Sequence, residues 1–507
     1  MKKRYIILGL AALMAVGSSC KKFLDQQPSS EASDQTTWKS DGDASVSVAA
    51  CYSLIRSSLN AAITYYSYGD LPTDEFSDVT GGDISFRDVL NVNWGIGIPS
   101  ANTYDPRLKL RLYTNFYTAI AQSNRCLYFI GNMPVSAFTG SDIAAQSARK
   151  NHYLGEAYFT RAFNYFYMSR VWGDVPLVTT YSADVSNAPQ LARTSQATVL
   201  AQAIADLNIA AKYLDWKDET SVDRVVRADK GAVYALLAHI YAWKGDYDNC
   251  NSACDSVINS QSNGLPSYSL VNGNDYLSIY KGQSDEGIFE IAQNSVSESS
   301  IIATSIAGMT LTQPYVTGIT IPDWQLNGST ITSLYYDSSD LRYQKAFTTI
   351  TLGTAQYNEC LKYSTIQNVN NNSAYQVSLS NIIVFRLADI ELLKAEALAA
   401  KSAPDYAGAL TLVNTIRTRA GLSTPLAGIT GPALLDTVTA ERGRELFLEG
   451  HRFYDLVRQY RNTGTDKLPN INSTELQSGK NYWPVDPTLF FLDANLTQTP
   501  FWIGKVF

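Results

Sequence analysis

Apolar residues recur at helical spacing over much of the chain. Positions 112, 116, 120, 127 and 130, for example, are all Leu, Phe or Ile. This spacing places the side chains on one face of a helix. Gly173 and Pro176 end a second helix, and Thr194 or Ser195 is placed to cap a third. The pattern predicts helices over 44–59, 106–130, 144–171 and 194–214.

Two further segments carry the pattern of a tetratricopeptide repeat, in which small residues let two helices approach closely. In 229–258, Gly245 marks the turn between the two helices. This register makes Cys250 and Cys254 core residues rather than metal ligands. A second, weaker match spans 393–416, where Glu396 occupies a normally apolar position. The residues assigned to the first repeat are Tyr234, Leu237, Ala238, Tyr241, Cys250, Cys254 and Val257.

Two long stretches lack helical periodicity. Residues 69–107 are interrupted by Gly and Pro, and residues 260–383 are rich in Ser, Thr, Asn, Gly and Tyr, with short β-type runs such as 287–292. Long loops of this kind are commonly functional. Their aromatic residues are therefore candidate ligand contacts: Trp94, Tyr104, Tyr315, Trp324, Tyr335 and Tyr336.

The first 19 residues have the order of a bacterial export signal. Three basic residues precede an apolar run over 5–16, and small residues lead to Cys20. The run is too short to span a bilayer, which needs about 20 residues. A cysteine after small residues resembles the lipoprotein signal, so we expect cleavage before Cys20 and lipid attachment at it. Several acyl chains anchor a protein stably where one is marginal.

Composition narrows the possible functions. The 507 residues include 40 Lys and Arg against 47 Asp and Glu, a net charge of −7, which argues against a nucleic-acid partner. The histidines, His152, His239 and His451, form no metal motif, and no D-x-D-x-D-G calcium run or Gly-rich nucleotide loop is present. We therefore predict no metal and no cofactor. The cysteines left after Cys20 are odd in number and do not form a disulfide framework.

A row of carboxylates has two possible interpretations. Glu441, Glu445 and Glu449 stand four residues apart, on one predicted helix, and resemble an acid–base pair for glycoside chemistry. Interleaved arginines such as Arg442 and Arg444 favour the ionised form of these groups, the opposite of what a general acid needs. The pattern favours a salt-bridge lattice that pins helices.

Short motifs follow one another along the chain in a fixed order. They are Phe23-Leu24-Asp25 with Pro28; Gly155-Glu156-Ala157, Arg161-Ala162 and Gly173-Asp174-Val175-Pro176-Leu177; Arg386-Leu387-Ala388-Asp389, Ala395-Glu396-Ala397, Asn414, Arg417 and Arg419-Ala420-Gly421; Glu441-Arg442, Glu445-Leu446, Glu449-Gly450, Arg452, Asp455-Leu456 and Arg458; and Trp483-Pro484 with Asn495-Leu496-Thr497-Gln498. In this order they resemble the motifs of the SusD/RagB family of outer-membrane nutrient-binding lipoproteins, over essentially the whole mature chain.

The resemblance implies a mainly α fold and a binding function without enzymatic activity. About four tetratricopeptide-like helix pairs, within about 43–260 and 383–460, pack against a loop-rich layer with a few short strands, all in one domain over 20–507. Family members capture glycan, or peptide in some branches, and deliver it to a TonB-dependent (SusC-like) outer-membrane transporter. A lipid-anchored protein facing the cell exterior is expected. A tetratricopeptide scaffold that binds only protein, and a hydrolase, remain alternatives.

The ligand site is predicted from position and chemistry, because the family's ligand residues vary. Aromatic rings stack on sugar faces, while charged side chains hydrogen-bond hydroxyls. Two tryptophans from distant loops would form one exposed platform. The predicted ligand-binding residues are Trp94, Trp324, Tyr104, Tyr336, Asp74 and Arg87.

Replacing the predicted lipid-bearing residue tests the anchor. Because acylation requires the thiol, Cys20→Ser should release the protein from the membrane fraction into a soluble one, as fractionation and an acyl-chain label would show. A variant that stays in the outer membrane with its label intact would contradict the assignment.

Overall fold

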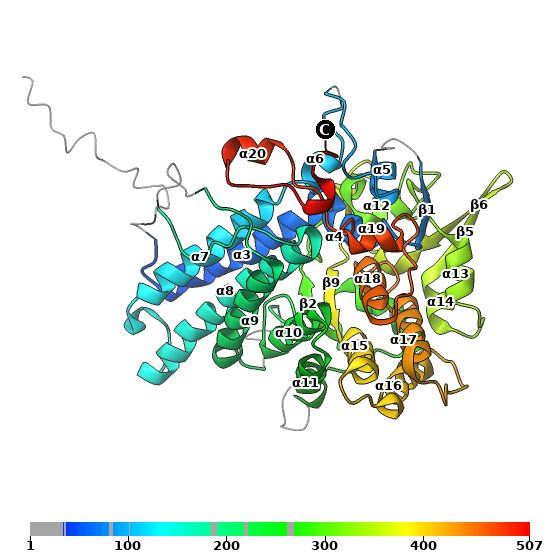
Figure 1. Ribbon diagram of the computed structural model, residues 1–507. Helices are drawn as coiled ribbons and strands as arrows, with labels where there is room; N and C mark the ends of the chain where they lie inside the picture. Colours follow the sequence, from blue (N-terminus) through cyan, green and yellow to red (C-terminus); the bar gives the residue numbers. More distant parts are fainter. Residues whose placement is uncertain are drawn as a thin grey trace, which may run out of the picture.

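Helices that pack in neighbouring pairs make up most of the protein, and a layer of loops and short strands lies above them in the view of Figure 1. The computed structural model describes residue 34 and residues 37–80, 85–100, 102–183, 190–216, 222–260 and 268–506. The signal segment and Cys20 lie outside these residues. The architecture is the mainly α fold that the sequence predicts.

Long helices with side-chain caps form the N-terminal half. Ser40, Asp142 and Ser195 each accept a hydrogen bond from a backbone N–H of the first turn, which satisfies a donor that the helix leaves unpaired. Ser195 is one of the two caps that the sequence predicts. The helices are α3 (Asp41–Asn60), α4 (Thr64–Gly69), α7 (Thr114–Asn132), α8 (Ile143–Trp172) and α9 (Gln196–Tyr213).

The helical run Asp41–Gly69 is long and apolar enough to cross a membrane by composition. One face of α3 instead packs on α7 and α8. Val48, Cys51 and Ile55 are fully buried there, whereas Val46 is exposed, and a third of the most apolar window is buried. Helix α3 therefore contributes one face to the core of the protein.

The helix predicted over 106–130 is two helices. Helix α6 (Arg107–Leu110) ends before α7 begins at Thr114. Between them, the buried Arg111 donates hydrogen bonds to the carbonyl oxygens of Trp94 and Ile96, each at 2.7 Å. These hydrogen bonds hold the segment between α6 and α7 against the loop that contains Trp94 and Ile96. The spacing of apolar residues does not reveal this constraint.

The predicted tetratricopeptide-like pairs are present. Helix α10 (Lys230–Lys244) ends at Gly245, whose φ of 75° permits the left-handed turn into α11 (Tyr247–Ile258). Cys250 and Cys254 are fully buried, as predicted. A second pair, α15 and α16, is followed by α17 and α18, and the carboxylate of Glu396 in α15 pairs with Arg458 at 2.9 Å. The bounds are α15 (Leu387–Ala400), α16 (Tyr406–Arg419), α17 (Gly431–Glu445) and α18 (Arg452–Thr463).

Short antiparallel strand pairs and short helices build the loop layer. Strand β2 pairs with β9 next to the helices, β1 pairs with β4, β5 with β6, and β8 lies between β3 and β7. The strands are β1 (Phe76–Val79), β2 (Gly287–Ile291), β3 (Ser300–Ile301), β4 (Trp324–Leu326), β5 (Phe347–Leu352), β6 (Ala355–Cys360), β7 (Ile366–Asn368), β8 (Gln376–Ser378) and β9 (Ile382–Arg386). The short helices are α5 (Phe86–Leu90), α12 (Ile306–Thr310), α13 (Gly328–Leu334), α14 (Leu341–Ala346), α19 (Ser473–Gln477) and α20 (Thr488–Leu492).

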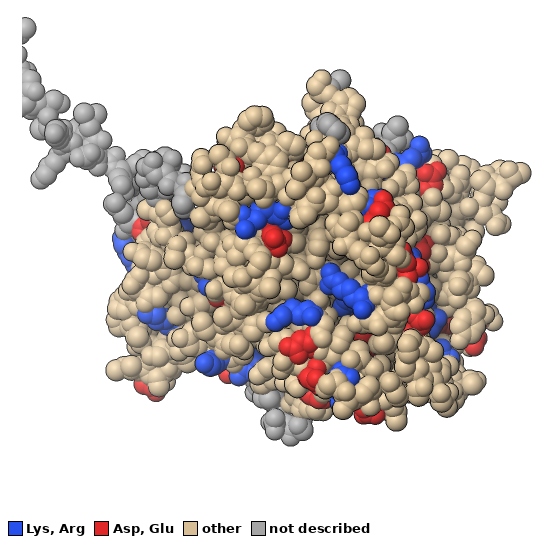
Figure 2. Space-filling view, in the orientation of Figure 1, with Lys and Arg blue, Asp and Glu red and all other residues tan. Residues whose placement is uncertain are grey.

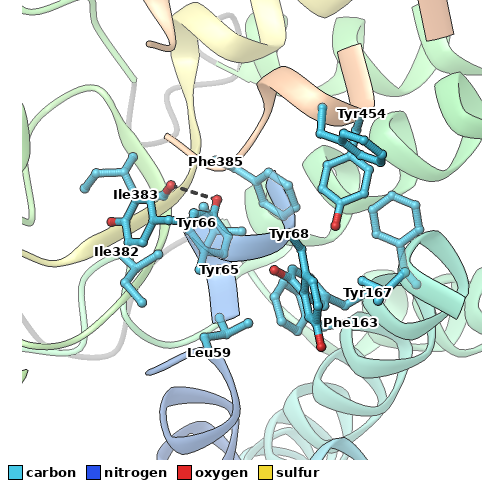
Figure 3. Packing of buried hydrophobic residues seen from close by; sticks show 14 of the residues in the cluster. Leu59, Tyr65, Tyr66, Tyr68, Phe163, Tyr167, Ile382, Ile383, Phe385 and Tyr454 are labelled. Carbon is cyan, nitrogen blue, oxygen red and sulfur yellow. Dashed lines mark hydrogen bonds between the residues drawn. The ribbon is translucent and has the colours of Figure 1, made fainter. Parts of the chain in front are cut away.

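Tyrosines fill the core where the helices meet this layer (Figure 3). Tyr65 and Tyr68 of α4 lie against Tyr167 of α8, with ring centroids 6.3 and 6.4 Å away. Their hydroxyls are satisfied by backbone: Tyr65 donates to Ile383 at 3.2 Å and Tyr68 to Leu110 at 2.6 Å. Each ring thus contributes apolar area and ties two segments together.

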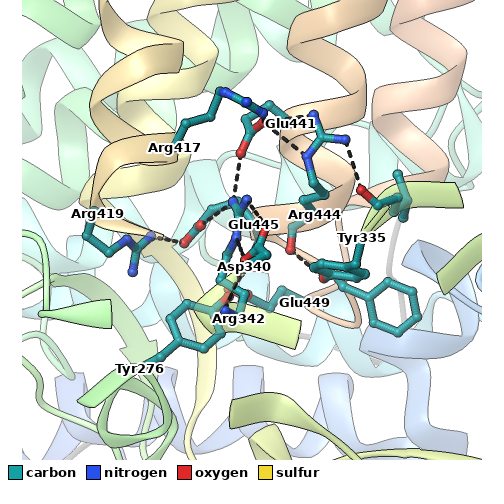
Figure 4. Close-up of polar contacts among 12 residues, drawn as sticks. Tyr276, Tyr335, Asp340, Arg342, Arg417, Arg419, Glu441, Arg444, Glu445 and Glu449 are labelled. Atoms are coloured by element: carbon teal, nitrogen blue, oxygen red, sulfur yellow. Dashed lines mark hydrogen bonds and ion pairs between the residues drawn. The ribbon is translucent and has the colours of Figure 1, made fainter. Parts of the chain in front are cut away.

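A buried ionic network joins the C-terminal helices to the loop layer (Figure 4). Its carboxylates are Glu441, Glu445 and Glu449, all almost completely buried. Arg342 of α14 contacts Glu441 at 2.7 Å and Glu445 at 3.0 Å, and Arg386 of β9 contacts Glu445 at 2.7 Å and Glu449 at 2.8 Å. Lys362 pairs with Glu449 at 2.6 Å, Arg419 pairs with Glu445, and Glu286 accepts from Arg386.

The network is structural, as the sequence analysis favours. Burial raises the pKa of Glu445, but Arg419, Arg386 and Arg342 outweigh it and hold the pKa well below its usual value. The pKa values of Glu441 and Glu449 are lowered in the same way. Carboxylates held ionised this firmly do not donate a proton to a leaving group.

One detail of that prediction is wrong, because the three glutamates do not share a helix. Helix α17 ends at Glu445, and Glu449 lies in the turn before α18. In this turn Leu448 has φ 60° and Gly450 has φ 77°. A Cβ on Gly450 would lie 2.3 Å from the ring of Tyr65, so glycine is required there by space as well as by conformation.

Candidate functional site

The two loop regions predicted to carry the site meet in space. Strand β1, from the first loop, pairs with β4, from the long insertion, with Phe76 opposite Leu326 and Val79 opposite Trp324. The chain thus brings together segments that are about 250 residues apart in sequence. The two loop regions thus meet through backbone pairing, whereas the sequence predicts that they meet through two exposed tryptophan rings.

Both predicted tryptophans are core residues. Trp94 has no exposed surface and stacks on Trp483 with ring centroids 4.3 Å apart. Trp324 is equally buried, with its ring 5.6 Å from Phe76 and 5.0 Å from Phe86. The expectation of an exposed two-tryptophan platform is therefore wrong. The sequence shows that Trp94 and Trp324 lie in loops, but it does not show that aromatic residues from other segments pack on both rings and bury them.

The four other predicted residues separate into different places. Arg87 donates to the carbonyl oxygen of Val79 at 2.7 Å and pairs with Asp78 at 3.2 Å, with about half of each charged side chain exposed. Tyr104 projects from its loop and is 88% exposed. Asp74 lines a pocket further along the same layer. Tyr336 does not line this pocket, but its ring lies next to Arg444, which does.

This pocket, named here the α13 pocket, has a volume of about 370 Å³. Helix α13 forms one wall, and α17 and α18 form the other. Its residues come from the first loop, the insertion and the C-terminal helices. They are Asp74, Ser329, Thr330, Ser333, Leu334, Thr439, Ala440, Arg444, Arg452, Gln459 and Lys467.

The charges around the α13 pocket are paired. Arg452 binds Asp74 through two hydrogen bonds, at 2.8 and 2.7 Å. Burial lowers the pKa of Arg452, but the attraction of Asp74 outweighs it and raises the pKa above its usual value. Arg444 binds Glu441 at 2.8 Å. A ligand here meets balanced ion pairs, which suits a neutral polar molecule.

Gln459 also lines this pocket. Its amide Nε2 donates to Asp436, which fixes the orientation of the amide. Its Oε1 is buried and has no hydrogen-bond partner among the described residues. The residue is only 2% exposed, so this unfilled acceptor costs free energy.

An exposed aromatic ring lies next to the pocket. Tyr336 is 66% exposed, and the guanidinium carbon of Arg444, a lining residue, lies 5.9 Å from its ring centroid. The hydroxyls of Ser329, Thr330 and Ser333 add donors and acceptors on the α13 side. A ring and several hydroxyls are groups that can hold a polyhydroxylated ligand.

Sequence reasoning missed most of this pocket. Gln459 lies on α18, within the region predicted to be helical, and Ser333 lies on α13, within the insertion predicted to be loop-rich and to carry the site. Neither is among the predicted ligand-binding residues. The one available signal was Asp74, whose partner Arg452 belongs to the C-terminal motif. Only the fold shows that these distant segments enclose a space.

A buried histidine cluster has the composition of a metal site. One ligand atom from each of His239, Asp389 and His451 lies within 4.8 Å of the others. Asp389 is already bound by His239 at 2.7 Å and by Arg442 at 2.9 Å. Burial lowers the pKa of His451 to about 4, so it is neutral near pH 7. Arg442 balances the carboxylate, and the cluster needs no cation to do so.

Two family models match the chain. The model described as "Starch-binding associating with outer membrane" matches residues 22–242, and the model described as "SusD family" matches residues 327–502. Together they match more than half of the chain. The chain belongs to the SusD family. SusD family proteins are binding proteins, which agrees with the firmly ionised glutamates.

SusD proteins match nearly the whole length. SusD-like protein P38 of Formosa agariphila is 27% identical in an alignment that is 534 positions long, gaps included. The alignment covers 96% of this chain and 97% of that protein. A SusD homolog from Bacteroides thetaiotaomicron is 27% identical with a TM-score of 0.77, covering 91% and 98% of the two chains. A second SusD superfamily structure from that organism is 26% identical with a TM-score of 0.72, covering 92% and 99%.

Truncating the two tryptophans tests whether they are core residues. Trp94→Ala and Trp324→Ala should each lower the free energy of unfolding by about 3–5 kcal/mol, because each leaves a cavity in the core. Chemical denaturation measures this loss. Tyr104→Ala is the control, and its exposed position should keep the change within about 0.5 kcal/mol. Wild-type stability in both tryptophan variants would contradict the burial.

Proposed function

We propose that this SusD protein is a cell-surface lipoprotein that captures oligosaccharide or polysaccharide and delivers it to a partner TonB-dependent outer-membrane transporter. The observation that carries the proposal is the match of its N-terminal half to starch-binding proteins that associate with the outer membrane. The order of the motifs and the likeness to SusD structures over nearly the whole chain support it.

The α13 pocket is the proposed glycan site. Its ion pairs are internally balanced, so a neutral sugar enters without separating charges. The hydroxyls of Ser329, Thr330 and Ser333 hydrogen-bond the sugar, and the exposed ring of Tyr336, next to Arg444, stacks on the C–H face of a neighbouring sugar unit. The volume of about 370 Å³ lies in the range of small-ligand sites and holds one or two sugar units of a longer chain.

Location and partner follow from the sequence and the family. The export signal and Cys20 supply a lipid anchor, so the protein is tethered to the outer membrane and faces the exterior. Because the protein binds the glycan without cleaving it, the glycan needs a route across the outer membrane. A SusC-like transporter provides this route. No cofactor takes part in this sequence of events.

Glycan binding by the purified full-length protein tests the proposal. We expect a glycan array to retain at least one neutral oligosaccharide, with no change in the length of the bound sugar after prolonged incubation. Retention of peptides alone would favour the peptide-binding branch, and shortening of the sugar would favour a hydrolase.

Two exposed tyrosines give a matched test of the site. Tyr336 is 66% exposed next to the α13 pocket, and Tyr375 is 68% exposed beside β8. Tyr336→Ala should weaken binding of the retained oligosaccharide by more than about 1 kcal/mol, roughly fivefold, as measured by calorimetry. Tyr375→Ala should bind as wild type. Equal affinities in the two variants would place the site elsewhere.

A further inference from the structure

A second concave site lies among the tetratricopeptide-like helices, between α9, α10, the end of α15 and α18. This groove, named here the α10–α18 groove, has a volume of about 680 Å³. Figure 2 shows basic side chains over the middle of this face, in front of α10 and α18, with acidic side chains below them. The groove shares no lining residue with the α13 pocket.

Arg461 is held in place at this groove. Its guanidinium carbon lies 4.1 Å from the ring centroid of Trp243, and it donates to the carbonyl oxygen of Trp243 at 3.1 Å and to the hydroxyl of Tyr482 at 3.3 Å. A guanidinium has five N–H donors, so several remain for a ligand. Holding the side chain in advance lowers the entropy lost on binding.

The groove carries positive charge that the protein does not neutralise. Among the described residues, no carboxylate lies within 4 Å of the charged nitrogens of Arg461 or Lys244, which is exposed at the end of α10. By contrast, Arg458 is paired with Glu396 at 2.9 Å.

The charged groups of the groove set its preference. Lys244 and Arg461 are both N–H donors and both carry positive charge, so they favour a ligand that supplies acceptors and negative charge.

The rest of the lining is unsuited to sugar. The ring face of Trp243 is covered by Arg461, so it offers no stacking surface. Ala197 and Ala400 supply small aliphatic surface instead. Such surface beside cationic donors matches an extended peptide, whose carbonyl oxygens and acidic side chains are acceptors and whose apolar side chains need aliphatic contacts.

We propose that the α10–α18 groove binds an acidic segment of a partner protein, with a carboxylate held between Lys244 and Arg461. The acidic side chains nearest along the chain do not fill this role. Asp246 caps α11 and binds Asn249 at 2.8 Å, and Asp248 accepts from Ser402 at 2.9 Å. This site is independent of glycan binding in the α13 pocket.

Selection from a library of displayed random dodecapeptides, on the immobilised full-length protein, tests the proposal. We expect the enriched sequences to contain Asp or Glu next to aliphatic residues. Their affinity should fall at least tenfold in the Lys244→Gln/Arg461→Gln double variant and should weaken as salt is raised. Lys244→Gln alone should weaken binding measurably, and because Lys244 is exposed, its fold is unaffected.

The control is Lys281→Gln, which removes an exposed cation outside the groove and should leave peptide affinity unchanged. No enrichment, enriched peptides without acidic residues, or equal affinity in the double variant would each overturn the proposal. If the double variant no longer binds an oligogalacturonate probe but still binds the peptide, the groove is a site for an acidic glycan instead. Glycan binding at the α13 pocket should persist in every one of these variants.

Discussion

The fold depends on neutralising three carboxylates that it buries. Glu441, Glu445 and Glu449 come from the end of α17 and the turn after it, and an unpaired charge at any of them would cost several kcal/mol. Arg419 of α16 and Arg444 of α17 supply part of the positive charge from the helices themselves. The rest comes from the loop layer: Arg342 and Lys362 from the insertion, and Arg386 from β9. Among the described residues, Glu449 pairs only with Lys362 and Arg386, so its charge is neutralised only when the loop layer is docked on the helices.

That docking also creates the binding surfaces. Glu441 binds Arg444, which lines the α13 pocket, and Arg452 binds Asp74 from the first loop on the other side of the pocket. The tyrosines of α4 add backbone ties from the helices to β9. The α10–α18 groove lies on the helical side, away from this junction. One domain thus offers a neutral polar pocket in its loop layer and a cationic groove among its helices.

The sequence predicts what local spacing controls. Periodicity located the helix pairs, the repeat register placed Cys250 and Cys254 in the core, and interleaved arginines identified the ionic network. Prediction from the sequence failed where contacts between residues distant in the chain determine whether a side chain is buried. Trp94 and Trp324 looked like exposed loop residues, but partners remote in sequence, such as Trp483 for Trp94, bury them. Gln459 is not among the predicted ligand-binding residues, because nothing in a helical pattern shows that one amide oxygen will lack a partner.

Native-state hydrogen exchange on Glu445→Gln tests the central role of the network most directly. This change removes the charge that Arg342, Arg386 and Arg419 share while keeping the side chain's size. If the network couples the two halves, amides of β2, β9 and α14 should lose protection together with those of α17, while α3 and α8 keep theirs. Loss of protection confined to α17 would contradict the coupling.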